Sequence, residues 1–424
     1  MKTGAGLTTC LKTVLLLVCI GIYSGTTMAN DKGSNTPLPN WDQYLNILAE
    51  SQQLLAMLED PDDPASQQAM YQLMVKTLAG GVFTAFSDPD YPDLVPAVNT
   101  VLNTVGVNPD FVYAYTKIDG RGQYRLSGYR GDGLFLMFDF IAGGLGVLDD
   151  LGPSLGTLDI DDFTLGPNGE FDILLSSERP EGHTGDWHRL DPTARTMNMR
   201  QASYHWGVDK EARIAIERID IAMDAQPLTS EEVARRIAGV MAYPKFYAGF
   251  AAKHIQNLRN KGLVNRLEHD DWAGRGGVAG QHYYQGLFKL EQGMALVLET
   301  ELPETVRYWN VQLSDMLWNS VNWMNHQSSL NGAQAVVDGD GKFRAVISAE
   351  DPGVANWLDT GGLREGSMML RWNGASSGPE PALRAVPLAD LKQALTADTV
   401  FVTPEQRQEQ LRERRRAVQF RRRW

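Results

Sequence analysis

Residues 168–180 read NGEFDILLSSERP, and residues 340–352 read DGKFRAVISAEDP. Aligned without a gap, the two stretches share five of thirteen residues, and apolar side chains alternate in both after an Asn-Gly or Asp-Gly turn. Alternation with a period of two after such a turn is typical of a β-strand that begins at a hairpin. The chain therefore contains the same strand unit twice.

The similarity continues in the same order beyond this unit. Residues 186–187 (DW) correspond to residues 356–357 (NW), and residues 197–200 (MNMR) correspond to residues 368–371 (MMLR). Three blocks in one order predict two related antiparallel β-sandwich or jelly-roll-like domains from an internal repeat. With helical additions, the expected fold class is mainly β (α+β).

Charged residues also recur in the two units. Arg200 and Arg371 end equivalent strands, and Glu178 and Glu350 start equivalent loops. Arginine and carboxylate groups form strong bidentate pairs. We therefore expect a structural Arg–carboxylate pair inside each unit.

Helical patterns frame and separate the β units. In residues 212–262, Thr229 is expected to begin a helix and Pro244 to break it. The predicted division is a cleaved signal peptide (1–29), an N-terminal helical region (30–106), a first β-sandwich unit (107–208), a helical connector (209–285), a second β-sandwich unit (286–380), and a C-terminal linker with a basic helix (381–424).

The first 29 residues have the pattern of a secretory signal. Two lysines precede an apolar run from Val14 to Tyr23, and small residues follow as far as Ala29. The run is about half as long as a membrane-spanning helix requires. We predict a periplasmic or secreted protein with no transmembrane segment. Both cysteines, Cys10 and Cys19, lie in this leader, which excludes a thiolate nucleophile or a Cys-bound metal cluster in the mature chain.

Charge is unevenly distributed along the chain. The formal net charge is −13, whereas Arg407–Trp424 contains eight Arg and two Glu. The acidic body argues against nucleic acid as a partner. The basic segment would suit a membrane surface or a polyanion. The alternative is a helix laid across this protein's own acidic surface.

The densest polar cluster is the loop Glu181–His188, which reads EGHTGDWH. Its candidate catalytic residues are Asp186, His188 and His183, because a His–Asp pair supplies a general base and a group that orients it. The same three residues would ligate a divalent metal, although no standard metal spacing is matched. The alternative is an ordinary capped loop. No other cofactor is predicted, since phosphate-binding, dinucleotide-binding and nucleophile-elbow motifs are missing from the sequence.

Aromatic and polar residues in the two equivalent loops form a second candidate site. Trp187, Asn356, Trp357 and Asp359 would bind a substrate, because an aromatic face beside amide and carboxylate groups suits a glycan or small organic ligand. The alternative is a tryptophan that plugs the end of each sandwich, with Asn and Asp bonding to the loop backbone.

The block Asp351–Gly361 (DPGVANWLDTG), followed by Arg371-Trp372, resembles a bacterial family catalogued as domain of unknown function 1214. The upstream stretches Asn108–Asp110 and Arg307–Trp309 are similar to the same family. The resemblance implies paired β-sandwich domains with helical additions and no particular reaction. It departs from the family at His326, where members carry Arg.

Together these observations predict an exported protein that binds, and transforms without a redox cofactor, a small organic or glycosidic substrate. Hydrolysis, elimination, hydration and isomerisation are the expected reaction types, which would make the protein a hydrolase or lyase. A non-catalytic periplasmic binding protein for a glycan or small molecule is one alternative. An envelope-assembly factor that acts through its basic tail is another.

Overall fold

The computed structural model describes residues 37–96, 98–143, 154–272, 277, 278 and 280–421. The predicted signal peptide lies outside these residues. Among the described helices, none is both long and apolar enough to cross a membrane.

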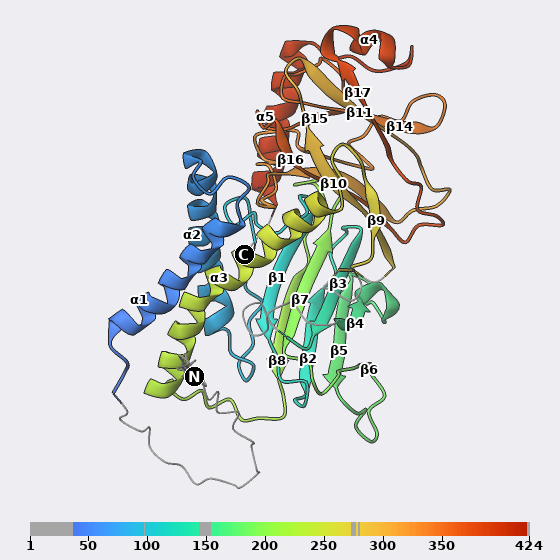
Figure 1. Cartoon of the computed structure of the whole chain (residues 1–424). Coiled ribbons are helices and arrows are strands. Elements are labelled where there is room, and N and C mark those ends of the chain that lie inside the picture. The colour runs from blue at the N-terminus through green and yellow to red at the C-terminus, as the bar shows by residue number, and fades with distance from the viewer. Residues whose placement is uncertain (1–36, 97, 144–153, 273–276, 279, 422–424) are drawn as a thin grey trace, which may run out of the picture.

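The described chain folds into two β units, with helices before, between and after them (Figure 1). The helices are α1 (Trp41–Ala49), the 3-10 helix η1 (Glu50–Met57), α2 (Pro64–Phe86), the 3-10 helix η2 (Ile160–Asp162), α3 (Ser230–Asn260), the 3-10 helix η4 (Leu388–Asp390), α4 (Leu391–Ala394) and α5 (Pro404–Phe420). The strands of the first unit are β1 (Phe111–Lys117), β2 (Tyr124–Tyr129), β3 (Phe135–Ile141), β4 (Ser154–Asp159), β5 (Glu170–Ser176), β6 (Asp186–Arg189), β7 (Thr196–Ala202) and β8 (Arg213–Arg218). Those of the second unit are β9 (Glu268–Asp270), β10 (Gln281–Lys289), β11 (Met294–Glu301), β12 (Tyr308–Ser314), β13 (Ser329–Asn331), β14 (Lys342–Ser348), β15 (Trp357–Asp359), β16 (Glu365–Asn373) and β17 (Ala382–Pro387).

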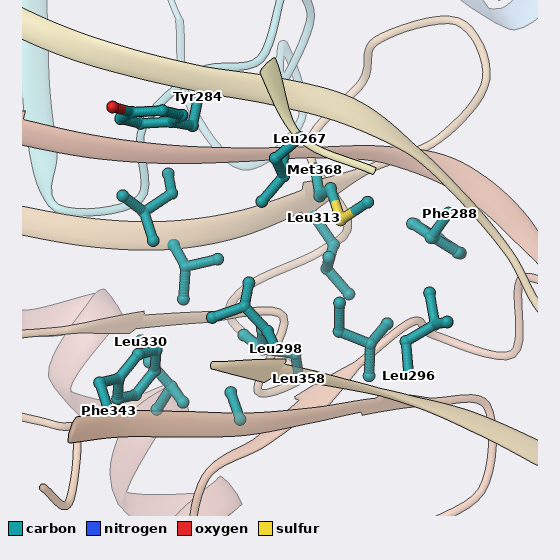
Figure 2. Packing of buried hydrophobic residues seen from close by; sticks show 14 of the residues in the cluster. Leu267, Tyr284, Phe288, Leu296, Leu298, Leu313, Leu330, Phe343, Leu358 and Met368 are labelled. Atoms are coloured by element: carbon teal, nitrogen blue, oxygen red, sulfur yellow. The ribbon is translucent and has the colours of Figure 1, made fainter. Parts of the chain in front are cut away.

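Each unit is a sandwich of two sheets around an apolar core. In the first unit, sheet β1-β7-β3-β4 and sheet β6-β5-β2-β8 contribute alternate side chains to one buried cluster. In the second unit, sheet β13-β12-β16-β10-β9 and sheet β15-β14-β11-β17 do the same. Figure 2 shows this second core, in which Phe343, Leu298 and Leu358 come from one sheet and Tyr284 and Met368 come from the other.

The two sandwiches repeat one topology. The order β6-β5-β2-β8 corresponds to β15-β14-β11-β17, and the order β1-β7-β3-β4 corresponds to β10-β16-β12-β13, with β9 as an added edge strand. The predicted mainly β fold class is thereby confirmed. One detail differs from the antiparallel expectation, because β6 and β15 pair in parallel with β5 and β14. In each unit, the loop after β5 or β14 turns the chain back alongside that strand before the next short strand begins, so the two strands run in the same direction.

Helices α2 and α3 lie side by side along the β units (Figure 1). Helix α3 begins where the sequence predicts, since the side chain of Thr229 accepts a hydrogen bond from the backbone N–H of Glu232. The predicted break at Pro244 is wrong, because α3 continues through it to Asn260. Pro244 is buried, and α2 approaches so closely that a Cβ at Gly81 would lie 2.8 Å from the Cβ of Tyr243. Packing against α2 therefore outweighs the loss of one helical hydrogen bond.

The basic C-terminal segment forms α5, which begins with a capping box between Thr403 and Gln406. Three arginines spaced seven residues apart, Arg407, Arg414 and Arg421, turn toward the protein. They donate to backbone carbonyl oxygens of Val354, Trp323, and Pro109 with Asp110, respectively.

These contacts place α5 across both units. Arg407 also forms an ion pair with Asp351 of the second unit, and Arg421 forms one with Glu211 of the first. Of the arginines expected to meet a membrane or polyanion, Arg412, Arg415 and Arg416 are exposed among the described residues. The described part of the tail is thus a helix laid across this protein's own surface.

Candidate ligand-binding site

The candidate catalytic residues lie in the first sandwich, and their side chains have separate partners. The carboxylate of Asp186 accepts hydrogen bonds from the backbone N–H of Thr164 (2.9 Å) and from its hydroxyl (3.3 Å). Nε2 of His183 lies 3.1 Å from the carbonyl oxygen of Asp186. The ring of His188 stacks on Phe140 with centroids 5.4 Å apart, and burial lowers the pKa of this histidine. Each of the three side chains therefore makes its own local contact, and none of these contacts joins two of the three side chains.

The same loop was a candidate metal site. Among the residues that the structure describes, no group of three or more His, Cys, Asp or Glu side chains is placed to hold a metal ion. His183, Asp186 and His188 all belong to the described residues. Their contacts are those of a capped and packed loop, and their catalytic and metal-binding roles stay predictions.

The two equivalent tryptophans are anchored within their own units. Nε1–H of Trp187 donates to the hydroxyl of Ser176 (2.9 Å), and Nε1–H of Trp357 donates to the carbonyl oxygen of Ser348 (3.2 Å). The guanidinium of Arg407 lies 5.2 Å from the ring centroid of Trp357, which is buried. Trp357 thus has the surroundings of a structural plug.

Asn356 and Asp359 are buried beside Trp357. The Asn356 amide exchanges hydrogen bonds with the backbone of Val336. Asp359 accepts a hydrogen bond from the backbone N–H of Gly361 (2.8 Å), and its other oxygen lies 2.8 Å from Nδ1 of His326. This bond to Asp359 raises the pKa of His326. The structure therefore brings Asn356, Trp357 and Asp359 together, but it uses them to hold the loop.

A cavity of about 170 Å³ lies where the two β units meet α3. Most of its wall is apolar and aromatic, and four polar side chains reach it. The aromatic wall includes Phe111, Tyr247, Phe250, Trp272 and Trp318, and the polar side chains are Asn198, Arg200, Gln281 and Arg371. An engineered cavity of about 150 Å³ binds benzene. The volume therefore suits a compact ligand of roughly one ring.

The internal repeat brings equivalent residues to this cavity. Tyr113 of β1 stands opposite Arg200 of β7, and Tyr283 of β10 stands opposite Arg371 of β16. All four residues line the cavity. Because β1 and β7 correspond to β10 and β16, the site contains two equivalent Tyr–Arg pairs, one from each unit.

The first arginine is neutralised inside its own unit. Arg200 forms an ion pair with Asp139 of β3, which is 1% exposed. The hydroxyl of Thr157 also donates to Asp139 (2.7 Å). The expected Arg–carboxylate pair is therefore present in the first unit, but its carboxylate is Asp139 and not Glu178.

The second arginine has neutral partners. Arg371 donates to Oε1 of Gln312 (2.7 Å), to Oδ1 of Asn310 (3.2 Å) and to the carbonyl oxygen of Gly106 (3.1 Å). Within the described part of the chain it forms no ion pair, although it is only 5% exposed. The expected pair with Glu350 is thus wrong for this unit.

The strand register explains the difference. Asp139 of β3 stands opposite Asn198 of β7, and Gln312 of β12 stands opposite Met369 of β16. Asn198 and Met369 each precede the cavity arginine by two residues. Gln312 therefore occupies in the second unit the position that Asp139 occupies in the first.

Hydrogen bonds connect Arg371 to a buried carboxylate. Nδ2 of Asn310 donates to Oδ1 of Asn108 (2.9 Å), Nδ2 of Asn108 donates to the hydroxyl of Tyr308 (2.7 Å), and that hydroxyl donates to Asp110 (2.8 Å). Three neutral side chains thus separate the cation from the anion. Burial raises the pKa of Asp110, although its hydrogen bonds act in the opposite direction.

The backbone beside Arg371 is held in an uncommon conformation. Gly106 has φ +59°, and a Cβ there would lie 2.4 Å from Nε1 of Trp318. Trp318 itself has φ +60°, in the region that non-glycine residues rarely adopt. Such outliers cluster at ligand sites. Both residues line the cavity.

Sequence reasoning singled out Arg371 but assigned it a structural ion pair. The alignment of the two repeats shows how the surroundings of Arg371 differ from those of Arg200. Extending the repeat aligns residues 138–140 (FDF) with residues 311–313 (VQL), which sets Asp139 against Gln312. The cavity itself has no local pattern, because seven separate segments meet to form it.

The segment that holds Gln312 and Arg371 is also the one that a known family matches. Residues 287–377 match the family described as Protein of unknown function (DUF1214). The predicted resemblance is confirmed. The matched residues run from within β10 to just beyond the end of β16 and so cover most of the second unit.

Solved structures that are similar to this chain include the following two. An uncharacterized protein from Burkholderia cenocepacia has a TM-score of 0.74 and 27% identity, covering 82% of this chain and 97% of its own. The VPA0106 protein from Vibrio parahaemolyticus has a TM-score of 0.43 and 12% identity, covering 74% of this chain and 98% of its own. No functionally curated protein matches the sequence. The Burkholderia structure supports the fold across most of the chain.

Proposed function

We propose that this protein binds a compact, largely apolar organic molecule in the cavity between its two β units. The observation that carries this proposal is the aromatic wall of the cavity, which equivalent strands of both units and α3 build together. Small-molecule sites are concave and mostly apolar, with a few polar groups that orient the ligand. The leader pattern of residues 1–29 supports export, so the ligand would be met outside the cytoplasm.

Binding is the role that the geometry supports best. Acid–base catalysis would need a proton-transferring group within reach of the ligand. His183, Asp186 and His188 are not among the residues that line the cavity, and each has a local partner. The hydrolase or lyase role therefore receives less support than non-catalytic binding.

The proposal is tested by filling the cavity. Phe250 of α3 lines it and is half-buried, so Phe250→Trp enlarges a side chain at the wall with little cost to the core. Wild-type protein should bind benzamide saturably in isothermal titration and should gain thermal stability from it. We expect Phe250→Trp to bind at least about tenfold more weakly, equivalent to about 1.4 kcal/mol.

Phe83→Trp is the matched control, because Phe83 is exposed on α2 and lies outside the cavity lining. It should bind as wild type does. Equal binding by the Phe250 variant would place the ligand elsewhere. If benzamide, other neutral single-ring probes and their carboxylate counterparts all fail to bind wild type, the cavity is not a ligand site.

A further inference from the structure

We propose that the ligand of this cavity carries a carboxylate, which binds the guanidinium of Arg371. This inference rests on the proposed function and adds the chemical class of the ligand. It starts from a buried cation whose described partners are all neutral: an amide oxygen of Gln312, an amide oxygen of Asn310 and the carbonyl oxygen of Gly106.

Burial makes that charge costly. A charged side chain taken out of water loses several kcal/mol of hydration, which a partner of opposite charge must offset. Neutral acceptors satisfy hydrogen-bonding groups of Arg371 but leave its net charge in place. The carboxylate of Asp110 is reached only through Asn310, Asn108 and Tyr308. Among the described residues, the positive charge of Arg371 therefore has no adjacent counter-ion.

The first unit shows what a complete arrangement looks like. There, Asp139 supplies the carboxylate that pairs with Arg200. In the second unit, Gln312 stands at the equivalent position and contributes an amide. A bound carboxylate would give Arg371 the counter-ion that Arg200 receives from its own chain. Planar guanidinium groups bind carboxylates with two parallel hydrogen bonds, which also fixes the orientation of the ligand.

The wall of the cavity also contains an amide oxygen without a hydrogen-bond donor among the described residues. Gln281 of β10 lines the cavity and is 8% exposed, and its Oε1 accepts no hydrogen bond from the described residues. Buried amide oxygens normally accept one. A ligand that carries a hydroxyl or N–H group would satisfy it.

The apolar walls define the remainder of the ligand. Rings of Tyr283, Trp272 and Trp318 line the cavity next to the polar groups, and such rings pack against aromatic molecules edge-to-face or in offset stacks. A volume of about 170 Å³ is too small to hold a long acyl chain inside the cavity. The class is therefore a single-ring or similarly compact carboxylic acid.

Benzoate and benzamide are the probes that test the charge, because they differ little in shape and only benzoate is anionic at neutral pH. Each is titrated into the full-length mature protein by isothermal calorimetry at low salt. We expect wild type to bind benzoate at least about tenfold more tightly than benzamide, since a charge-assisted bond is roughly twice as strong as a neutral one.

Two variants assign the preference to Arg371. Arg371→Gln removes the cation, and Asn310→Asp places a carboxylate of the chain itself against the guanidinium. Both should bind benzoate and benzamide about equally. Arg125→Gln is the control, because Arg125 is exposed on β2 and pairs with Asp172. It should keep the wild-type preference.

Circular dichroism and thermal unfolding establish which variants fold. If neither Arg371→Gln nor Asn310→Asp folds, the two titrations of wild type still test whether the site prefers a carboxylate. If benzamide binds wild type as tightly as benzoate, the carboxylate inference is overturned while the cavity remains a ligand site. If a folded Arg371→Gln protein keeps the preference for benzoate, the anion binds at another group and the inference is also wrong. If neither probe binds wild type, the proposed function fails together with it.

Discussion

The two β units have the same strand order and place the same Tyr–Arg pair in one cavity, yet they treat the arginine differently. In the first unit, Arg200 is paired with Asp139, and the charge is balanced within the chain. In the second, Arg371 meets only neutral groups among the described residues. A single position, Asp139 against Gln312, separates the two cases. A duplicated fold can thus keep one copy as a structural support and leave the equivalent copy open to a ligand.

The largest effect should come from breaking the pair in the first unit. Asp139→Asn removes the buried carboxylate that pairs with the partly buried Arg200, and breaking such a pair typically costs about 3–5 kcal/mol of unfolding free energy. Urea denaturation measures this loss.

Asp172→Asn is the matched control, because Asp172 pairs with Arg125 on the surface, where an ion pair contributes less than about 1 kcal/mol. If Asp139→Asn costs no more than the control, the ion pair does not neutralise the first arginine, and the contrast between the units disappears.

A smaller difference should separate the serines that support the two tryptophans. The hydroxyls of Ser176 and Ser348 each donate to the carbonyl of the residue two positions later, both at 2.7 Å. Only Ser176 Oγ also accepts the indole N–H of its tryptophan, since Trp357 bonds to a backbone carbonyl instead. Ser176→Ala should therefore cost about 1 kcal/mol more than Ser348→Ala in urea denaturation. Equal costs would show that the indole of Trp187 finds another acceptor.

The smallest effect concerns pH and is confined to the second unit. Because Asp359 raises the pKa of His326, the pair stabilises the fold fully below the ordinary histidine pKa of about 6.5 and loses that contribution as the pH rises through the raised value. His326→Arg keeps the charge at every pH. We expect the variant and wild type to be equally stable at pH 5.5, and the variant to be more stable at pH 9 by less than about 1 kcal/mol.

Unfolding of both proteins in urea at the two pH values measures this difference. His205→Arg, at an exposed histidine of the first unit, serves as the control for replacing a histidine by an arginine. A variant at position 326 with the pH dependence of wild type would contradict the pairing with Asp359.

Much of the fold was predictable, because its signals are local. The Asn-Gly and Asp-Gly turns with alternating apolar residues in 168–180 and 340–352 mark β5 and β14, and Thr229 marks the start of α3. Pro244 was misleading, since its effect on α3 depends on packing against α2 that a local pattern does not contain. The parallel pairing of β6 and β15 was likewise missed, because strands this short carry little periodicity.

The site was less predictable, and for a physical reason. Histidines and acids in a glycine-rich loop attract attention in a sequence, but His188 is packed on Phe140 and Asp186 is bonded to Thr164. The cavity depends instead on common residues, such as Tyr283 and Gln281, that become significant only when two sandwiches and a helix meet. Whether the charge of Arg371 is balanced depends on which side chains these separate segments bring next to it.

The heptad-spaced arginines of α5 also have a consequence for the order in which this protein is made. Helix α5 follows both sandwiches in the chain, so a ribosome completes the two units before it supplies this helix. Arg421 then reaches the backbone of Asp110, where the polar chain from Arg371 ends. The contacts of this helix therefore form last, and they reinforce two units that Asn108, Tyr308 and Asn310 already connect directly.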